Sequence, residues 1–215
     1  MTDDSTKVPV KLLVDTGASD AIWLSEKSDE RINLPKNHIE TFIGRGLSGD
    51  LFGIKGRIDG IWVGPLILPQ PIVAFPNSEI IDQLMTSNDR NGTIGAEILR
   101  RFYVTIDYRN SRLTLRPNHK INDEFNCNMS GMEIINPMPG LPIFTITNIR
   151  ENSPAYLAGL KENDQILSLN NSSRSDLELN DINLLLQSKE NKKIKVKYLR
   201  EGVEYETSFE LKKLF

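Results

Sequence analysis

An aspartate followed by threonine and glycine stands at residues 15–17 of this 215-residue chain, within the stretch VKLLVDTGASDAIW. The hydrophobic residues before Asp15 predict a buried strand that delivers its carboxylate, and Gly17 allows a sharp turn beneath it. Two such carboxylates face to face would share one proton, because like charges so close cannot both ionise. The charged member can then deprotonate a water while the protonated member hydrogen-bonds a scissile carbonyl. The turn therefore predicts one half of a hydrolytic acid–base pair.

Asp-Thr-Gly is also a common turn tripeptide, so the motif alone does not establish catalysis. Two further features favour the catalytic interpretation. The stretch TIGAEILRRF, which begins at Thr93, places Ile94 and Gly95 before a predicted short helix with Ile98, Leu99 and Phe102 on one face. The stretch FIGRGLSGDLFGIKG, residues 42–56, is rich in glycine and predicts a mobile β-hairpin between the two.

In this order, the aspartate turn, the glycine-rich hairpin and the glycine before a helix resemble the lobe of a retropepsin-like aspartic peptidase of bacterial type. The resemblance implies that Asp15 is the catalytic carboxylate, that Thr16 interlocks with a matching threonine, and that Gly17 lines the groove. It makes residues 44–53 the flap. It assigns substrate contacts to Ala18, Gly44, Gly46, Gly49 and Gly53.

The second aspartate is missing, because the chain has no other Asp-Thr-Gly or Asp-Ser-Gly, and Asp59 in IDG lacks the hydroxyl residue. A dyad then requires either a second chain about a two-fold axis or a further lobe upstream. The start of the first strand so near Met1 favours the upstream lobe. Ala18 stands where pepsin-like members carry a hydroxyl, so we expect a less acidic carboxylate and a working pH nearer neutral.

The second half resembles a PDZ domain, most visibly in ENSPAYLAGLKENDQILSLNN, and the resemblance covers Phe125 to Phe215. A PDZ domain binds an extended peptide as an additional strand. We expect the receiving loop and strand in PMPGLPIF and the residues after it. The predicted peptide-binding residues are Gly140, Leu141, Ile143, Phe144, Thr145 and Ile146. Pro142 cannot donate an amide, which favours strand addition along Phe144–Thr147 over capture of a terminal carboxylate.

The predicted fold is mainly β with two domains. Residues 1–118 form a retropepsin-like closed β lobe, the polar residues 119–131 form a linker or the start of the next domain, and residues 132–215 form a small α+β PDZ domain. The apolar side of a helix around Ile182–Leu186 would be the far wall of the peptide groove or simply core.

Composition narrows the partners. Lysine plus arginine total 26 against 29 acidic residues, which leaves no electrostatic footprint for nucleic acid, and no apolar run is long enough to span a membrane. Cys127, His38 and His119 are too few for a zinc cluster, so we expect neither metal nor cofactor. The residues leave the location open, and the family resemblance implies an extracytoplasmic one.

The prediction is an aspartic endopeptidase that uses a water activated by Asp15 and a partner aspartate, with a PDZ domain that binds polypeptide. The alternative is a non-catalytic peptide-binding scaffold. The segment GRGLSG, Gly44–Gly49, also satisfies the dinucleotide pattern G-x-G-x-x-G, but that pattern needs a helix to begin there. Glycines at 53, 56 and 60 follow instead, so a nucleotide site is rejected.

Overall fold

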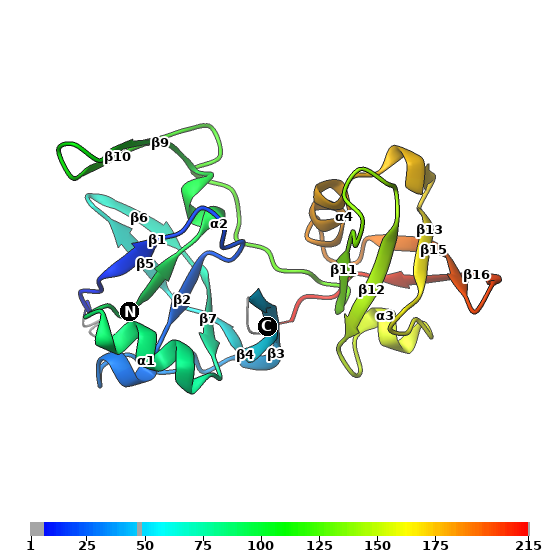
Figure 1. Ribbon diagram of the computed structural model, residues 1–215, viewed down its shortest axis with the longest axis horizontal. Helices are drawn as coiled ribbons and strands as arrows, with labels where there is room; N and C mark the ends of the chain where they lie inside the picture. Colours follow the sequence, from blue (N-terminus) through cyan, green and yellow to red (C-terminus); the bar gives the residue numbers. More distant parts are fainter. Residues whose placement is uncertain (1–6, 47–48, 215) are drawn as a thin grey trace. The chain divides into compact units, whose positions relative to one another are not determined.

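The computed structural model describes residues 7–46 and 49–214 (Figure 1). The chain divides into two compact units, one up to Phe125 and one from Asn126 to Leu214. Strands dominate both units, which confirms the predicted mainly β fold with two domains. The unit boundary falls inside the polar segment that the sequence suggested as a connection.

The first unit is built on a six-stranded sheet with strand order β1-β8-β2-β7-β4-β3. These strands are β1 (Leu12–Val14), β2 (Ile22–Leu24), β3 (His38–Gly46), β4 (Gly49–Arg57), β7 (Ile72–Pro76) and β8 (Gly92–Ile94). All five residues of β7 are buried, because β7 lies between β2 and β4 in the middle of the sheet. At one end of the sheet, β1 pairs in parallel with β8.

Two further strand pairs belong to this unit. β5 (Gly60–Val63) pairs with β6 (Leu66–Pro69), and β9 (Phe102–Asp107) pairs with β10 (Arg112–Pro117) as an antiparallel ribbon. The ribbon forms its own two-stranded sheet, apart from the six-stranded one (Figure 1).

The helices of the first unit are α1 (Glu79–Ser87), α2 (Ala96–Leu99) and the 3-10 turn η1 (Glu26–Ser28). α2 and its buried residues Ile98 and Leu99 confirm the predicted helix, but the helix ends at Leu99, and Phe102, predicted on the same helical face, begins β9. α1 was not predicted from the sequence. A nine-residue helix is marginal by itself and depends on packing, here of Met85, which is 2% exposed.

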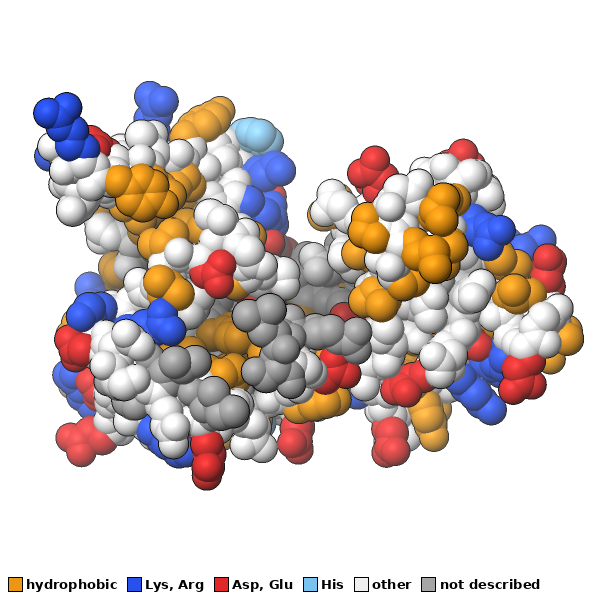
Figure 2. Space-filling view, in the orientation of Figure 1, with side chains coloured by type: hydrophobic (Ala, Val, Ile, Leu, Met, Phe, Trp, Pro, Cys, Tyr) orange, Lys and Arg blue, Asp and Glu red, His pale blue; other side chains and the backbone are white. Residues whose placement is uncertain are grey.

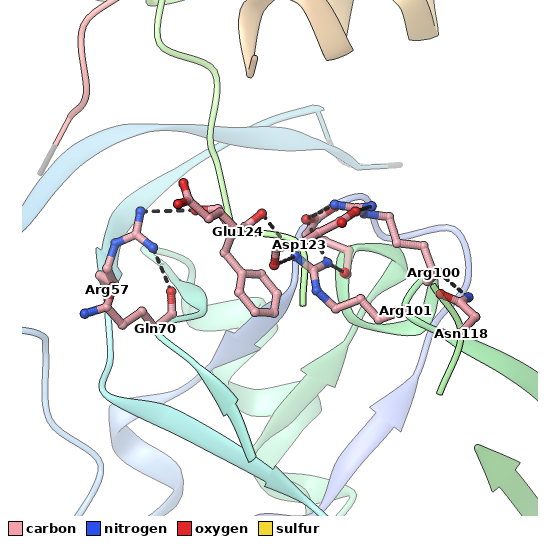
Figure 3. A network of polar contacts seen from close by, with 9 residues as sticks. Arg57, Gln70, Arg100, Arg101, Asn118, Asp123 and Glu124 are labelled. Carbon is pink, nitrogen blue, oxygen red and sulfur yellow. Dashed lines mark hydrogen bonds and ion pairs between the residues drawn. The ribbon is translucent and has the colours of Figure 1, made fainter. Parts of the chain in front are cut away.

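The segment after β10 is fixed onto the first unit by arginines (Figure 3). Arg101 is fully buried, donates to the carbonyl oxygens of Asp123 and Glu124 at 3.0 and 3.2 Å, and stacks on the Phe125 ring at 3.7 Å. Arg57 donates to the carbonyl oxygen of Phe125 at 3.1 Å. The chain therefore remains attached to the first unit as far as Phe125.

Glu97 holds the two adjacent arginines of this network from the α2 side. It accepts from Arg101 at 2.9 Å and from Arg100 at 2.6 and 2.8 Å, and Arg100 also reaches Asp123 at 3.0 Å. Burial lowers the pKa of the Arg101 guanidinium, and the hydrogen bond that it donates to Glu97 opposes that shift. Glu97 thus compensates a buried charge that holds the exit segment in place.

The second unit is a sheet of order β11-β12-β13-β15-β16, with β14 paired to β13. Its strands are β11 (Met132–Ile135), β12 (Phe144–Ile149), β13 (Gln165–Leu169), β14 (Ser172–Ser173), β15 (Lys193–Arg200) and β16 (Val203–Glu210). Helices α3 (Pro154–Leu157) and α4 (Leu179–Leu186) and the 3-10 turn η2 (Arg174–Asp176) complete it. The helix predicted around Ile182–Leu186 is therefore present as α4.

The sheet strands and both helices of this unit contribute to one hydrophobic core. Ile182 and Leu186 of α4 are buried in it, which assigns that side of the helix to the core. A buried ion pair supports the core at the start of β13. Arg200 donates to both oxygens of Asp164 at 2.7 Å, and the Asp164 side chain is 1% exposed.

Candidate active site and peptide-binding edge

Asp15 follows directly on β1, at the turn that joins β1 to the loop before β2. Its backbone N–H donates to the carbonyl oxygen of Ile94 in β8 at 3.0 Å, which extends the β1–β8 pairing by one residue. The N–H of Gly17 donates to Asp15 Oδ1 at 2.8 Å. Among the described residues, Oδ2 has no hydrogen-bonding partner. The turn therefore fixes one oxygen and leaves the other available.

The expectation of a buried strand before Asp15 was wrong. Leu13 is 45% exposed and Val14 is 37% exposed, because β1 is the last strand of the sheet and has only β8 beside it. Thr16 and Gly17 are also exposed. Among the described residues, the carboxylate is thus flanked by four exposed residues, of which Leu13 and Val14 are apolar.

The loop after the turn is fixed against the start of α2. Ala96 donates its N–H to the carbonyl oxygen of Ala18 at 2.7 Å, and Gly95 donates to that of Ala21 at 2.9 Å. A Cβ at Gly95 would stand 2.2 Å from the backbone oxygen of Asp20, so only glycine allows this approach. The glycine that the sequence singled out before the helix therefore positions the loop that carries Asp15.

The predicted flap is the β3–β4 hairpin. β4 pairs with β7 from Gly53 to Arg57, and beyond Gly53 its ladder partner is β3 alone among the described residues. Gly53 lies at the base, where a Cβ would stand 2.2 Å from the Phe75 oxygen. Gly44 lies along the hairpin, and Gly46 and Gly49 pair near its tip. Residues 47 and 48 of the predicted flap lie outside the described residues.

Two cavities in the first unit have volumes of about 410 and 510 Å³. The larger one lies at the hairpin base and is lined by residues such as His38, Gly53 and Asp82. Asp15 lines neither cavity. Within the described part of this unit, the carboxylate therefore lies on a surface and not in either of these cavities.

The expected open edge at Phe144–Thr147 was wrong. These residues belong to β12, which pairs with β11 on one side and with β13 on the other, so its backbone groups face strands on both sides. Phe144 and Ile146 are 1% and 0% exposed and are part of the core. Ile143 and Thr145 are partly buried, and Gly140 and Leu141 lie in the β11–β12 loop.

The strand at that end of the sheet is β11, which the sequence did not single out as the peptide-binding edge. Among the described strands, β11 pairs only with β12, so its other edge is open. The preceding loop approaches the end of α4, since Met129 donates to the Leu186 carbonyl oxygen at 3.0 Å. The stretch NMSG ends in Gly131 just before β11, and a glycine directly ahead of a strand could have indicated the peptide-binding loop. The sequence prediction placed that loop at Gly140 instead.

A cationic side chain lies beside this loop. Arg150 donates its backbone N–H to the Gly131 carbonyl oxygen at 2.8 Å, and a Cβ at Gly131 would lie 3.4 Å from the Arg150 guanidinium. Burial lowers the pKa of Arg150, while Cys127 nearby raises it. The start of β11 therefore combines a left-handed glycine, with φ of 80°, and a partly desolvated cation.

Comparison with known families agrees with both halves of the chain. Residues 3–98 match the family described as aspartyl protease, and residues 145–200 match the family described as PDZ domain. The chain therefore carries a retropepsin-like aspartyl protease domain followed by a C-terminal PDZ domain. No curated protein matches it significantly.

Several solved proteases show limited structural similarity. The photosystem II D1 C-terminal processing protease matches with 20% identity, TM-score 0.35, and coverage of 39% of this chain and 22% of its own. The HtrA-type protease AlgW with decapeptide matches with 13% identity and a TM-score of 0.40, and the match covers 93% of this chain and 63% of AlgW. The serine endoprotease from Yersinia pestis matches with 12% identity and a TM-score of 0.39, and the match covers 86% of this chain and 65% of that protein. The chain thus spans less than two thirds of the length of each of these proteins.

Three further features bear on function: metal-binding groups, membrane-spanning helices and the cysteine. In the parts of the chain that the structure describes, no group of three or more His, Cys, Asp or Glu side chains is placed to hold a metal ion. Over the same residues, no helix is long and apolar enough to cross a membrane. Cys127, the one cysteine of the sequence, is partly buried.

Proposed function

We propose that the first unit is one lobe of an aspartic endopeptidase, in which Asp15 pairs with the corresponding aspartate of a second lobe. The observation that carries the proposal is the turn itself: Gly17 fixes Oδ1, while Oδ2 is without a partner among the described residues on an uncovered surface. The family match over residues 3–98 supports it.

The chemistry then follows from one proton shared by two carboxylates. The ionised member takes a proton from water as it attacks the peptide carbonyl, and the protonated member donates to the carbonyl oxygen. The resulting intermediate breaks down with proton transfer to the leaving amine. In this scheme Thr16 contacts the second lobe, Gly17 and Ala18 line the groove, and the hairpin with Gly44, Gly46, Gly49 and Gly53 closes over the peptide.

Exposed apolar side chains support a second lobe as the partner. Besides Leu13 and Val14, the β9–β10 ribbon exposes large apolar residues, and orange side chains lie over it at the upper left of Figure 2. They are Tyr103, Ile106, Tyr108 and Leu113, which are 60%, 44%, 88% and 40% exposed. Ile106 and Leu113 lie opposite each other across the two strands, and adjacent exposed apolar side chains are typical of an interaction site. The second lobe is either another copy of this chain or a lobe joined to it.

For the second unit we propose that β11 accepts an extended polypeptide at its open edge. Gly131 turns the chain into that strand, and Arg150 lies beside the turn, where it would favour an anionic group of the ligand. We also propose the division predicted from the sequence: lobe 1–118, connection 119–131 and PDZ domain 132–215. The compact units on either side of Phe125 support it.

The test is cleavage of a mixed peptide library across pH by the wild type and by Asp15→Asn, each as a monomer and in a completed form. The completed form is a concentrated dimer or the chain with a supplied lobe. We expect activity only in the completed form, and a loss of about 10³-fold or more in the variant. Asparagine is nearly isosteric, so the circular dichroism spectrum and unfolding midpoint should be unchanged.

Equal activity of the two proteins would assign the turn to structure alone. If no completed form cleaves any peptide while peptides still bind β11, the non-catalytic scaffold is the better account. Binding to β11 is followed by NMR shifts of the Met132–Ile135 amides, which do not depend on catalysis.

A further inference from the structure

Asp20 lies in the loop after the Asp15 turn, and its carboxylate joins this loop to the two strands β2 and β4. Its Oδ2 accepts the indole N–H of Trp23 in β2 at 2.8 Å, and its Oδ1 accepts from Lys55 Nζ in β4 at 2.9 Å. The Lys55 and Asp20 side chains are only 16% and 19% exposed. Hydrogen bonds to ionised groups in such partly buried places are stronger than those of exposed pairs.

Through these two partners Asp20 is linked to both strands of the hairpin, because Lys55 belongs to β4 and Trp23 lies beside β3. Lys55 lies two residues from Gly53, the position at which β4 parts from β7. Trp23 approaches the other strand, since a Cβ at Gly44 of β3 would lie 3.8 Å from Trp23 Cζ2. Asp20 therefore reaches β4 directly and β3 through the indole ring.

On its other side, Asp20 belongs to the fixed loop. Its backbone oxygen lies against Gly95, and Ala18, two residues earlier, accepts from Ala96 at 2.7 Å. Because the same loop continues back to Asp15 over five residues, it has little freedom to absorb a displacement of Asp20. The position of the hairpin and the position of the carboxylate are thus linked through a short, well-packed segment.

We propose that Asp20 is a positioning residue that locks the β3–β4 hairpin to the loop carrying Asp15. Its bonds to Lys55 and Trp23 hold the hairpin in the arrangement seen here, and their loss releases the hairpin beyond Gly53. The inference rests on the proposed peptidase function only in giving the hairpin the role of a flap. The lock itself is measurable without catalysis.

The experiment uses the full chain in a Trp62→Phe background, so that Trp23 is the only tryptophan. The variants are Asp20→Asn, which keeps an oxygen for the indole, Lys55→Met, and the conservative Lys55→Arg. The matched control is Lys11→Met, which breaks an ion pair with Asp89 of the same 2.9 Å length at an exposed site. Hydrogen–deuterium exchange is followed for all described strands, together with Trp23 emission.

We expect amides of the hairpin to exchange about tenfold faster in Asp20→Asn and Lys55→Met, with a shift of Trp23 emission to longer wavelength. Lys55→Arg should restore slow exchange, and Lys11→Met should change it by less than about twofold. Because both singles break one pair, the double variant Asp20→Asn/Lys55→Met should exchange no faster than either.

Faster exchange in every strand of the first unit, with a matching fall in its unfolding midpoint, would overturn the lock in favour of a general structural role. Unchanged hairpin exchange would overturn it outright. In the completed enzyme, the lock predicts a KM raised about tenfold in Lys55→Met with kcat largely retained. If exchange responds as expected but no completed form cleaves peptides, the lock stands and the proposed peptidase function fails.

Discussion

The two units differ in what they leave uncovered. In the first, the strand that leads to Asp15 and the β9–β10 ribbon both expose large apolar side chains, including Leu13 and Ile106 at 45% and 44%. The second exposes apolar side chains too, such as Leu157 at 73%, and in addition leaves the backbone edge of β11 without a partner among the described strands. Uncovered side chains call for a partner surface of matching shape, whereas an uncovered edge accepts many extended peptides.

Under the proposed functions, the two units would recognise their partners by different physics. A lobe that must place two carboxylates within hydrogen-bonding distance needs a partner of fixed geometry, which apolar packing provides. A strand edge binds through backbone hydrogen bonds and is less selective for sequence. If the two units are independent in this way, a substitution that destabilises one unit should leave the unfolding free energy of the other unchanged.

The largest effect is expected for Arg101→Met, which removes the buried cation that holds the exit segment. The carbonyl oxygens of Asp123 and Glu124 would lose their donor, so the first unit should lose about 2–4 kcal/mol of unfolding free energy. Urea unfolding followed separately in each unit measures it. The second unit should be unaffected.

Arg100→Met is the matched control, since Arg100 is 34% exposed although it shares Glu97 and Asp123 with its neighbour. We expect a cost of about 1 kcal/mol or less. Equal costs for the two variants would contradict the role assigned to the buried guanidinium, as would a loss shared by both units.

A smaller loss, about 2 kcal/mol and confined to the second unit, is expected for Asp164→Asn. Asparagine keeps the shape and one acceptor oxygen but loses the charge that pairs with Arg200. Thermal unfolding of each unit, followed by exchange-resolved mass spectrometry, measures it. A loss that spread to the first unit would show that the two units do not unfold independently.

How far the sequence predicts this molecule depends on how local each signal is. The short helix after Gly95 and the close turn at Gly95 itself are set by neighbouring residues, and the structure has them. Leu13 and Val14 were predicted to be buried because they are apolar. Whether a second lobe covers them cannot be inferred from the neighbouring residues. Whether a strand lies at the edge or in the centre of a sheet likewise depends on the whole sheet. The prediction that β12 offers the open edge was therefore wrong, and β11 lies at the edge instead.

The site was predictable in part for the same reason. Asp15, Gly17 and the hairpin glycines lie in short motifs that a sequence displays. Asp20 and Lys55 are 35 residues apart and are brought together only by the pairing of β4 with the sheet. A pair of ordinary charged residues carries no sign of that contact until the fold is known.

Next in size is the effect of Ile106→Glu on association. Ile106 lies opposite Leu113 in the ribbon, and both are exposed. A charge there should raise the dissociation constant of the paired lobes about tenfold, because it would be desolvated in the interface. The unfolding free energy of the monomer should change by less than about 0.5 kcal/mol.

Sedimentation over a concentration series measures this association. Leu157→Glu is the control, since Leu157 of the second unit is 73% exposed and belongs to no proposed lobe contact. Equal weakening by both substitutions would show that apolar exposure in general drives association, and the contrast between the units would no longer hold.

The smallest effect is a pH-dependent one at an exposed pair in the first unit. Hydrogen bonds from the Arg31 side chain lower the pKa of Asp29 from 3.8 to about 2. Because the folded-state pKa lies below the ordinary value, the pair stabilises the unit above pH 3.8, and this contribution is lost as the pH falls towards 2. Arg31→Met should remove most of it, while the backbone N–H of residue 31 still donates to Asp29 and keeps part of the shift. The difference in urea midpoint between wild type and variant should therefore be constant near neutral pH, shrink between about pH 4 and pH 2, and vanish below that. NMR titration of the Asp29 carboxyl carbon checks the cause directly. A midpoint difference that persisted at pH 2 would show that Arg31 acts through packing, and the pair would then belong with the structural contacts of the lobe instead of with its surface charges.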